Sequence, residues 1–246
     1  MADGIYVSMC GAVARQEQLD AVADNLANAQ TRGFKASRPA FEAFLPAAGG
    51  YDKSYPAPVS TALDLRPGQT TTTGNPLDVL PEDGAFLAVQ TRGGAVAYTR
   101  DGRIELDADR RLVVGGNAVL SRGGQAIVVP AEYVPEVDAN GQVRARLHGP
   151  ASGRQEEIVL GEIATFQLAG PVERIGASLL RPGAGGQATL VDDGRIRAGE
   201  VELGNATGLE SAVAMIAAQR SFEASMQAIQ TYRRLDERAV EVGRVR

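Results

Sequence analysis

The chain of 246 residues is 44% hydrophobic and 22% charged, a composition typical of globular proteins that bury a core. Its 25 basic and 30 acidic residues leave a net charge of −5, which gives no electrostatic attraction to phosphate backbones or anionic lipid, so nucleic acid is a poor candidate partner. Because Cys10 and His148 are the only residues of their kinds, the chain cannot form an internal disulfide or a metal site of the Cys/His type.

Neither a membrane span nor a secretory signal is indicated by the sequence. The longest apolar runs are far shorter than the ~20 residues that a membrane-spanning helix needs, so no membrane insertion is expected. Residues 1–10 include Asp3 and Tyr6 and have no basic start followed by a continuous apolar stretch. We therefore expect no cleavable secretory signal, so the protein either stays in the cytoplasm or leaves by a route that does not read such a signal.

The N-terminal segment is predicted to form a helix from Ile5 to Asn28. It contains no proline, and apolar or small residues recur in it at close to helical spacing. Asp3 is suited to cap the start of this helix, and Gly33 is suited to end the turn that follows it. Cys10 lies among small residues of the helix, where a packed thiol is the expected state.

A connector is predicted after the first helix. The stretch from Ala47 to Gly74 contains Pro56, Pro58 and Pro67. Proline fixes its own backbone angle and lacks an N–H group for pairing. This composition therefore indicates an extended connector or docking arm rather than a core element.

The middle of the chain is predicted to be a β domain. Turn pairs such as Asp83–Gly84 and Asn140–Gly141 recur at short intervals and separate short β-prone runs. Residues 142–147 alternate strictly between polar and apolar, which indicates a strand with one face in water. The predicted strands, which fit an antiparallel sandwich or an open barrel, cover residues 86–90, 95–99, 112–114, 127–129, 142–147 and 158–167.

A second long helix is predicted from Gly208 to Val242. Thr207 and Glu210 have the spacing of a capping box, in which hydroxyl and carboxylate each satisfy an exposed backbone N–H. Such a helix is about 50 Å long, and it cannot bury a narrow apolar stripe without a partner helix. The fold class is therefore predicted as α+β, with long N- and C-terminal helices packing as a coiled coil and a central antiparallel β domain.

No catalytic constellation is apparent. Residues 183–188 match a loose dinucleotide pattern, with Glu202 near the distance of a ribose ligand, but the pattern lacks the strand before it and the helix after it that phosphate binding needs. His148 is expected in an exposed turn. We therefore expect no enzyme, no cofactor and no bound metal. Glycosidase chemistry needs only two suitably separated carboxylates, so a carbohydrate-active or cell-wall-binding β domain stays open as an alternative function.

Five motifs follow one another in order between residues 25 and 231. They are Asn25–Asn28 with Thr31–Lys35, Gly74–Asp78, Asp83–Phe86, Tyr98–Gly102, and Met215–Glu223 with its continuation to Thr231. Together they resemble the signatures of bacterial flagellar rod and hook proteins, and they cover nearly the whole chain. Within that family, the compact length and short connector are most similar to the proximal rod members, whereas Asp24 stands where Asn or Ser is usual.

The resemblance implies a structural, axial subunit of the flagellar basal-body rod with no catalytic site. Proteins of this family are similar in lacking a cleaved signal and in passing unfolded through the flagellar type III export apparatus. They polymerise into a tube across the periplasm that transmits torque and conducts export. The implied partners are other copies of the chain, neighbouring proximal and distal rod proteins, and the export apparatus.

We expect the two ends of the chain to form the interfaces with other subunits. We expect a terminal helical domain of residues 1–35 plus 207–246, a connector of residues 36–76 plus 195–206, and a central β domain of residues 77–194. Asn25, Asn28, Gly33 and Phe34 are expected to shape the end of the first helix and its turn into the connector. Helix contacts within and between subunits are expected from Leu19, Leu26, Ile216, Phe222, Met226 and Ile229.

Overall fold

The computed structural model describes residues 2–44, 55–147 and 157–244, and the chain divides into two compact units. The first comprises Met1–Ala29, Ser37–Ala62 and Ala206–Arg246, and we call it the helical unit. The second comprises Gln30–Ala36 and Leu63–Asn205, and we call it the β unit. Both ends of the chain therefore belong to the helical unit.

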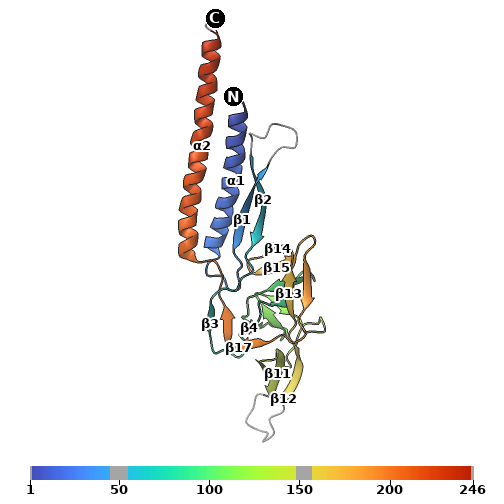
Figure 1. Cartoon of the computed structure of the whole chain (residues 1–246). Coiled ribbons are helices and arrows are strands. Elements are labelled where there is room, and N and C mark those ends of the chain that lie inside the picture. Colours follow the sequence, from blue (N-terminus) through green and yellow to red (C-terminus); the bar gives the residue numbers. More distant parts are fainter. Residues whose placement is uncertain (1, 45–54, 148–156, 245–246) are drawn as a thin grey trace. The chain divides into compact units, whose positions relative to one another are not determined.

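Two long helices build the helical unit. Helices α1 (Ala2–Ala27) and α2 (Gly208–Arg244) pack along each other and run in opposite directions (Figure 1). Strand β1 (Ser37–Phe44) pairs with β2 (Tyr55–Leu63), and β1 lies against α1. The paired terminal helices and the antiparallel sheets between them in the chain confirm the predicted α+β class.

The helix ends follow from local signals. Helix α2 begins at Gly208, as predicted, and the carbonyl of Thr207 accepts the N–H of Ser211 at 2.9 Å. That bond is the first of the helix, and it places Thr207 at the N-cap position that its side chain favours. Helix α1 ends at Ala27, and the N–H of Asn28 still donates to the carbonyl of Asp24 at 3.1 Å.

The β unit is built from short strands. In chain order they are β3 (Thr70–Thr72), β4 (Val79–Pro81), β5 (Phe86–Gln90), β6 (Val96–Thr99), β7 (Glu105–Leu106), β8 (Leu112–Val114), β9 (Asn117–Val119), β10 (Tyr133–Val137), β11 (Gln142–Leu147), β12 (Glu157–Glu162), β13 (Thr165–Ala169), β14 (Val172–Arg174), β15 (Leu179–Pro182), β16 (Gln187–Leu190), β17 (Ile196–Ala198) and β18 (Glu200–Glu202). The turn pairs of the sequence lie between these strands, which is why the strands are short.

Antiparallel pairing joins these strands into a main sheet and three smaller ones. The main sheet runs β14-β15-β6-β5-β9-β8-β7, and β13 pairs with both β5 and β16. Strands β10, β11 and β12 form a second sheet, and one buried apolar cluster includes Leu87 and Val89 of the main sheet together with Val143 and Ala145 of the second. The last strands return to the first ones, since β17 pairs with β4 and β18 pairs with β3.

Two predicted strands differ from the structure. Residues 158–167 are split between β12 and β13, because the chain changes partners there: the N–H of Ile163 donates to Gly141 and that of Ala164 donates to Leu120. Residues 127–129 do not form a ladder, and Val128 makes an isolated bridge to Arg111. Its neighbours Ile127 and Val129 are buried in the core. The apolar pattern therefore indicated burial correctly but not strand pairing.

The predicted connector also contains paired strands. Residues 36–76 hold β1, β2 and β3, whereas the sequence indicated an extended arm from Ala47 to Gly74. Each strand of a two-stranded sheet has one open edge. At that edge no hydrogen bond to a neighbouring strand is needed, so the missing N–H of proline costs nothing. Pro56 and Pro58 are therefore compatible with β2, although they argued against a core strand in the sequence.

Candidate functional site

Small side chains line the packed faces of the helical unit. Among the described side chains, the buried ones of α1 are Ala12, Ala14, Ala21 and Val22, and those of α2 are the polar Ser211 and the apolar Ala218. Small residues let two helix backbones approach closely, whereas large ones keep them apart. Small side chains are therefore the ones that the described part of the helical unit buries most deeply.

An apolar face of α2 is left exposed in the helical unit. Leu209, Val213 and Ile216 follow one another at steps of four and three residues, which places them on one side of the helix. Their exposed fractions are 76%, 61% and 53%. We call these three residues the α2 apolar face. Helix α1 packs on the opposite side of α2, so the subunit itself leaves this face uncovered.

The predicted helix contacts fall into two groups. Leu19 and Leu26 of α1 and Phe222 and Ile229 of α2 are half-buried. Ile216 and Met226 are exposed, and Met226 lies off the α2 apolar face. The first group is available for contacts within the subunit and the second for contacts outside it, and their role as interfaces stays a prediction.

Two asparagines organise the end of α1. The side chain of Asn25 donates to the carbonyl of Ser37 at 2.9 Å and accepts the N–H of Ser37 at 2.8 Å. The amide of Asn28 donates to the backbone and the side chain of Asp24, at 3.0 and 2.9 Å. Asn25 thus fastens the start of β1 to α1, and Asn28 closes the last turn of the helix.

Gly33 and Phe34 occupy positions that few other residues could fill. Gly33 has a φ of 64°, and a Cβ atom there would lie 2.1 Å from the backbone nitrogen of Asp101. Phe34 is fully buried, and the guanidinium of Arg174 lies 4.3 Å from its ring centre. The turn predicted from sequence therefore packs inside the β unit.

A buried charge cluster that no sequence motif predicted lies beside this turn. The carboxylate of Glu202 accepts hydrogen bonds from the Lys35 ammonium at 2.7 Å, from Arg100 Nε at 2.8 Å and from the backbone N–H of Gly68 at 2.9 Å. A second Arg100 nitrogen also contacts it. The three charged side chains are at most 3% exposed. We call Lys35, Arg100 and Glu202 the charge cluster.

Backbone carbonyls complete the hydrogen bonding of the charge cluster. Lys35 donates to the carbonyl of Arg66 at 2.8 Å, and Arg100 donates to the carbonyls of Pro81, at 2.9 Å, and Ala85. Buried ions are tolerated when each is paired and hydrogen-bonded. The cluster contains two cations and one anion, so its net charge is +1. The negative ends of these carbonyl dipoles therefore help to balance the second cation.

Burial and charge act in opposite directions on the pKa values of the cluster. Burial is the largest influence on Lys35 and lowers the pKa of its ammonium below 10.5, although Glu202 acts to raise it. Burial also acts to raise the pKa of Glu202, but the charges of Arg100 and Lys35 outweigh it, and the pKa lies below 4.5. The carboxylate is therefore ionised at neutral pH.

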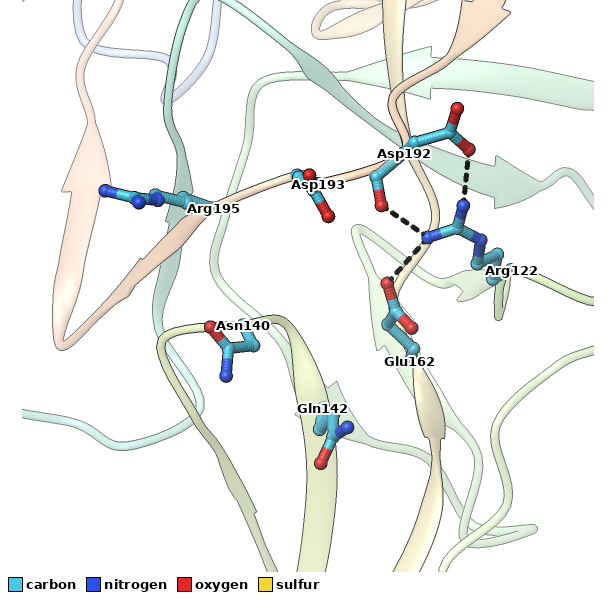
Figure 2. A pocket seen from close by; sticks show the side chains of 8 residues that line it. Arg122, Asn140, Gln142, Glu162, Asp192, Asp193 and Arg195 are labelled. Carbon is cyan, nitrogen blue, oxygen red and sulfur yellow. Dashed lines mark hydrogen bonds and ion pairs between the residues drawn. The ribbon is translucent and has the colours of Figure 1, made fainter.

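A polar hollow in the β unit bears on the carbohydrate alternative. It has a volume of about 390 Å³, and Figure 2 shows Glu162 and Asp192 on its wall with the guanidinium of Arg122 between them. Arg122 lies 3.2 Å from Glu162 Oε1 and 2.5 Å from Asp192 Oδ1. A glycosidase needs two carboxylates that face the sugar, whereas an arginine joins these two. The geometry is that of an ion-paired clamp between loops.

Cys10 and His148 are the single thiol and the single imidazole of the chain. Cys10 is exposed, so the prediction of a packed thiol is wrong. Among the α1 side chains that the structure describes, the first buried one is Ala12, so the packed part of the helix starts after Cys10. His148 lies outside the described residues. Among the described residues, no group of three or more metal-ligating side chains occurs, and no helix is long and apolar enough to cross a membrane.

Three family models match the chain in the order that the motifs suggested. Residues 5–35 match "Flagella basal body rod protein", residues 82–145 match "Flagellar hook protein FlgE/F/G D1 domain", and residues 197–242 match "Flagellar basal body rod FlgEFG protein C-terminal". The chain is 32% identical to the flagellar basal-body rod protein FlgF of Salmonella typhimurium, over 93% of both chains. The chain belongs to the flagellar basal-body rod protein family. It is thus a structural subunit, and its family is not enzymatic.

Other relatives also match over most of both chains. The FlgF protein of Mesorhizobium japonicum is 31% identical, over 91% of this chain and 90% of its own. The FlgG protein of Borreliella burgdorferi is 29% identical, over 94% and 95% respectively. Each member of the charge cluster lies in a different matched segment: Lys35 in the first, Arg100 in the second and Glu202 in the third.

Proposed function

We propose that this rod subunit assembles through its terminal helices, with α1 and α2 pairing through small residues and the α2 apolar face packing on neighbouring subunits. The observation that carries the proposal is the exposure of Leu209, Val213 and Ile216 in a helix that is already paired on its other side. The proposed neighbours are other copies of this chain and the adjoining proximal and distal rod proteins. The resulting tube transmits torque and conducts export.

The test is a charge placed on the α2 apolar face. Ile216→Asp puts a carboxylate where a neighbouring helix would bury it, and burial of an unpaired carboxylate costs several kcal/mol. Gln219→Asp is the matched control, because Gln219 is polar and exposed on the same helix. Sedimentation of the purified chain and motility of complemented cells are compared. Loss of self-association and swimming with Ile216→Asp alone supports the proposal, and wild-type behaviour of that variant refutes it.

We also propose a proximal position in the rod and export to the periplasm through the flagellar type III apparatus. The similarity to two FlgF proteins over nearly the whole chain supports the proximal position. A single cysteine supports export as an unfolded chain, because no disulfide within it can block threading. Imaging of a tagged protein in purified basal bodies tests both points, and the tag should appear at the base of the rod.

The division of labour along the chain is proposed as well. We propose that residues 1–35 plus 207–246 supply the assembling helices, that residues 77–194 supply the outer β domain, and that residues 36–76 plus 195–206 connect them. The exposed apolar residues of α2 support a role in assembly for the helical part. The continuous buried cluster of the β unit supports its independence as a folded body.

A further inference from the structure

The charge cluster fastens together three parts of the chain that lie far apart in sequence. Lys35 follows α1, Arg100 follows β6, and Glu202 ends β18. The backbone adds direct bonds at the same place: the N–H of Gly33 donates to the carbonyl of Glu202 at 3.0 Å, and the N–H of Asn205 donates to that of Phe34 at 3.1 Å. The segment that leaves the first helix is thus bonded to the segment that leads to the second.

Asn205 closes the same junction without a charge. Its side-chain oxygen accepts the N–H of Ala36 at 2.6 Å, and its side-chain nitrogen donates to the carbonyls of Asp64 at 2.7 Å and Arg66 at 3.0 Å. Together with Glu202, it makes residues 196–205 a return segment that is held to residues 33–36 and 64–68. We call the residues from 33 to 36 and from 203 to 205 the helix roots.

The core of the β unit depends little on the return segment. Ile196 is the one residue of that segment in the main apolar cluster, whose other members come from Val79 to Ile163. When the return segment is absent, Lys35 and Arg100 lose the carboxylate that joins them, and two buried cations face each other unpaired. Burial of unpaired like charges is unfavourable, so we expect both cations to turn into water when Glu202 is not in place. We call that arrangement open and the observed one closed.

The closed state limits how far the two helices can separate. Helix α1 ends six residues before Gly33, and α2 begins three residues after Asn205. Even fully extended, chain segments of that length reach about 20 and 10 Å. Closure of the roots therefore raises the effective concentration for the intramolecular pairing of α1 with α2, because open roots leave the helices joined only through the whole β unit.

We propose that the charge cluster is a latch, and that its closing is the conformational step that makes the subunit competent to assemble. The inference rests on the proposed function, because assembly is taken to use the paired helices. Glu202 arrives near the end of the chain, so the latch stays open in any partly emerged or partly folded subunit. The latch can therefore close only after residues 30–205 have folded, and closing brings the helix roots together at that stage.

Glu202→Gln in the full chain tests the latch. The change keeps size and hydrogen-bonding ability but removes the charge shared by Lys35 and Arg100. Hydrogen exchange should become at least tenfold faster in residues 30–36, 63–68 and 196–205 while β5 stays protected, and self-association should weaken at least tenfold. Glu200→Gln is the matched control on the same strand, since Glu200 pairs with exposed Arg197. Root segments and association that both match the control overturn the proposal, as do open roots with unchanged association.

Two further measurements keep the test decisive. If Glu202→Gln fails to fold, amide hydrogen exchange of the unaltered chain is measured in low urea instead. The amides of Gly33, Gly68 and Asn205 should then open together and before those of β5. Independent opening of the three amides contradicts a latch. Ile216→Asp separates this inference from the proposed function. That variant should keep protected roots and yet not associate, whereas an Ile216→Asp chain that associates refutes the helix interface and leaves the latch to be judged on root exchange alone.

Discussion

Glu202 and Lys35, 167 positions apart in the chain, form an ion pair of 2.7 Å in which both side chains are almost completely buried. The pair joins the segment after the first helix to the segment before the second, and Arg100 shares the same carboxylate. Removing one partner of a buried ion pair typically costs about 3–5 kcal/mol, because the other charge stays buried without compensation. The junction therefore contributes to the stability of the β unit in addition to its buried apolar cluster.

Acid should weaken the β unit through Glu202. The folded state holds the pKa of this carboxyl below 4.5, so the stabilisation is fully present above pH 4.5 and is lost as the pH falls through the lower, folded value. Urea unfolding between pH 7 and pH 3 measures the effect. Glu202→Gln should lower stability at pH 7 and flatten this part of the pH profile. A variant that keeps the wild-type slope would show that other carboxylates cause the acid sensitivity.

Gly33→Ala should destabilise the chain strongly. Its φ of 64° costs an ordinary residue about 1–2 kcal/mol, and the added Cβ would meet the backbone at Asp101. Gly11→Ala is the control, since Gly11 lies within α1 and has open space around it, so alanine should stabilise the helix by about 0.5–1 kcal/mol. Thermal unfolding of both variants gives the comparison, and equal shifts in the same direction would contradict the tight turn.

Phe222→Asp should block assembly while the β unit stays folded. Phe222 is half-buried on α2, so a carboxylate there would be desolvated in the paired helices that assembly is proposed to use. Ile229→Asp should behave in the same way. Circular dichroism and sedimentation of the purified variants separate folding from assembly. Normal assembly and motility of Phe222→Asp would rule out this position as a buried helix contact.

Proteolysis of dilute monomer should trim the chain ends before it cuts the segment from Asp78 to Leu190. Terminal helices that need partners are weakly held in an isolated chain, whereas the core strands of the β unit are buried. Mass spectrometry of the early fragments identifies the first cuts. Early cleavage within β5 or β6 would contradict the proposed division of the chain.

Replacing both Cys10 and His148 with alanine should leave rods and swimming intact. Cys10 is exposed, so its loss should change stability by less than about 0.5 kcal/mol, and His148 is expected in a turn. A catalytic or ligand-binding role would instead lower activity by orders of magnitude in a folded protein. Motility in soft agar is the measurement, and a folded, exported but non-motile double variant would reopen the search for chemistry at these positions.

Elements whose signals are local could be predicted from the amino-acid sequence. Helical spacing and the Thr207 cap predicted both terminal helices and the start of α2, and turn pairs separated strands such as Phe86–Gln90 and Leu112–Val114. The family was also readable from the sequence, because its motifs are short runs of neighbouring residues. Each of these signals involves residues within a few positions of one another, where spacing alone decides the geometry.

Features that depend on partners far apart in the chain emerge only in the folded molecule. Lys35 and Glu202 look like ordinary surface charges until the return strand β18 brings them together, and the prolines of β2 look like breaks until β1 pairs with that strand. Which side of α2 is covered depends on where α1 packs, and that contact joins two segments at opposite ends of the chain. Burial of a charge or of a helix face is a property of two segments in contact, so it cannot be predicted from one of these segments alone.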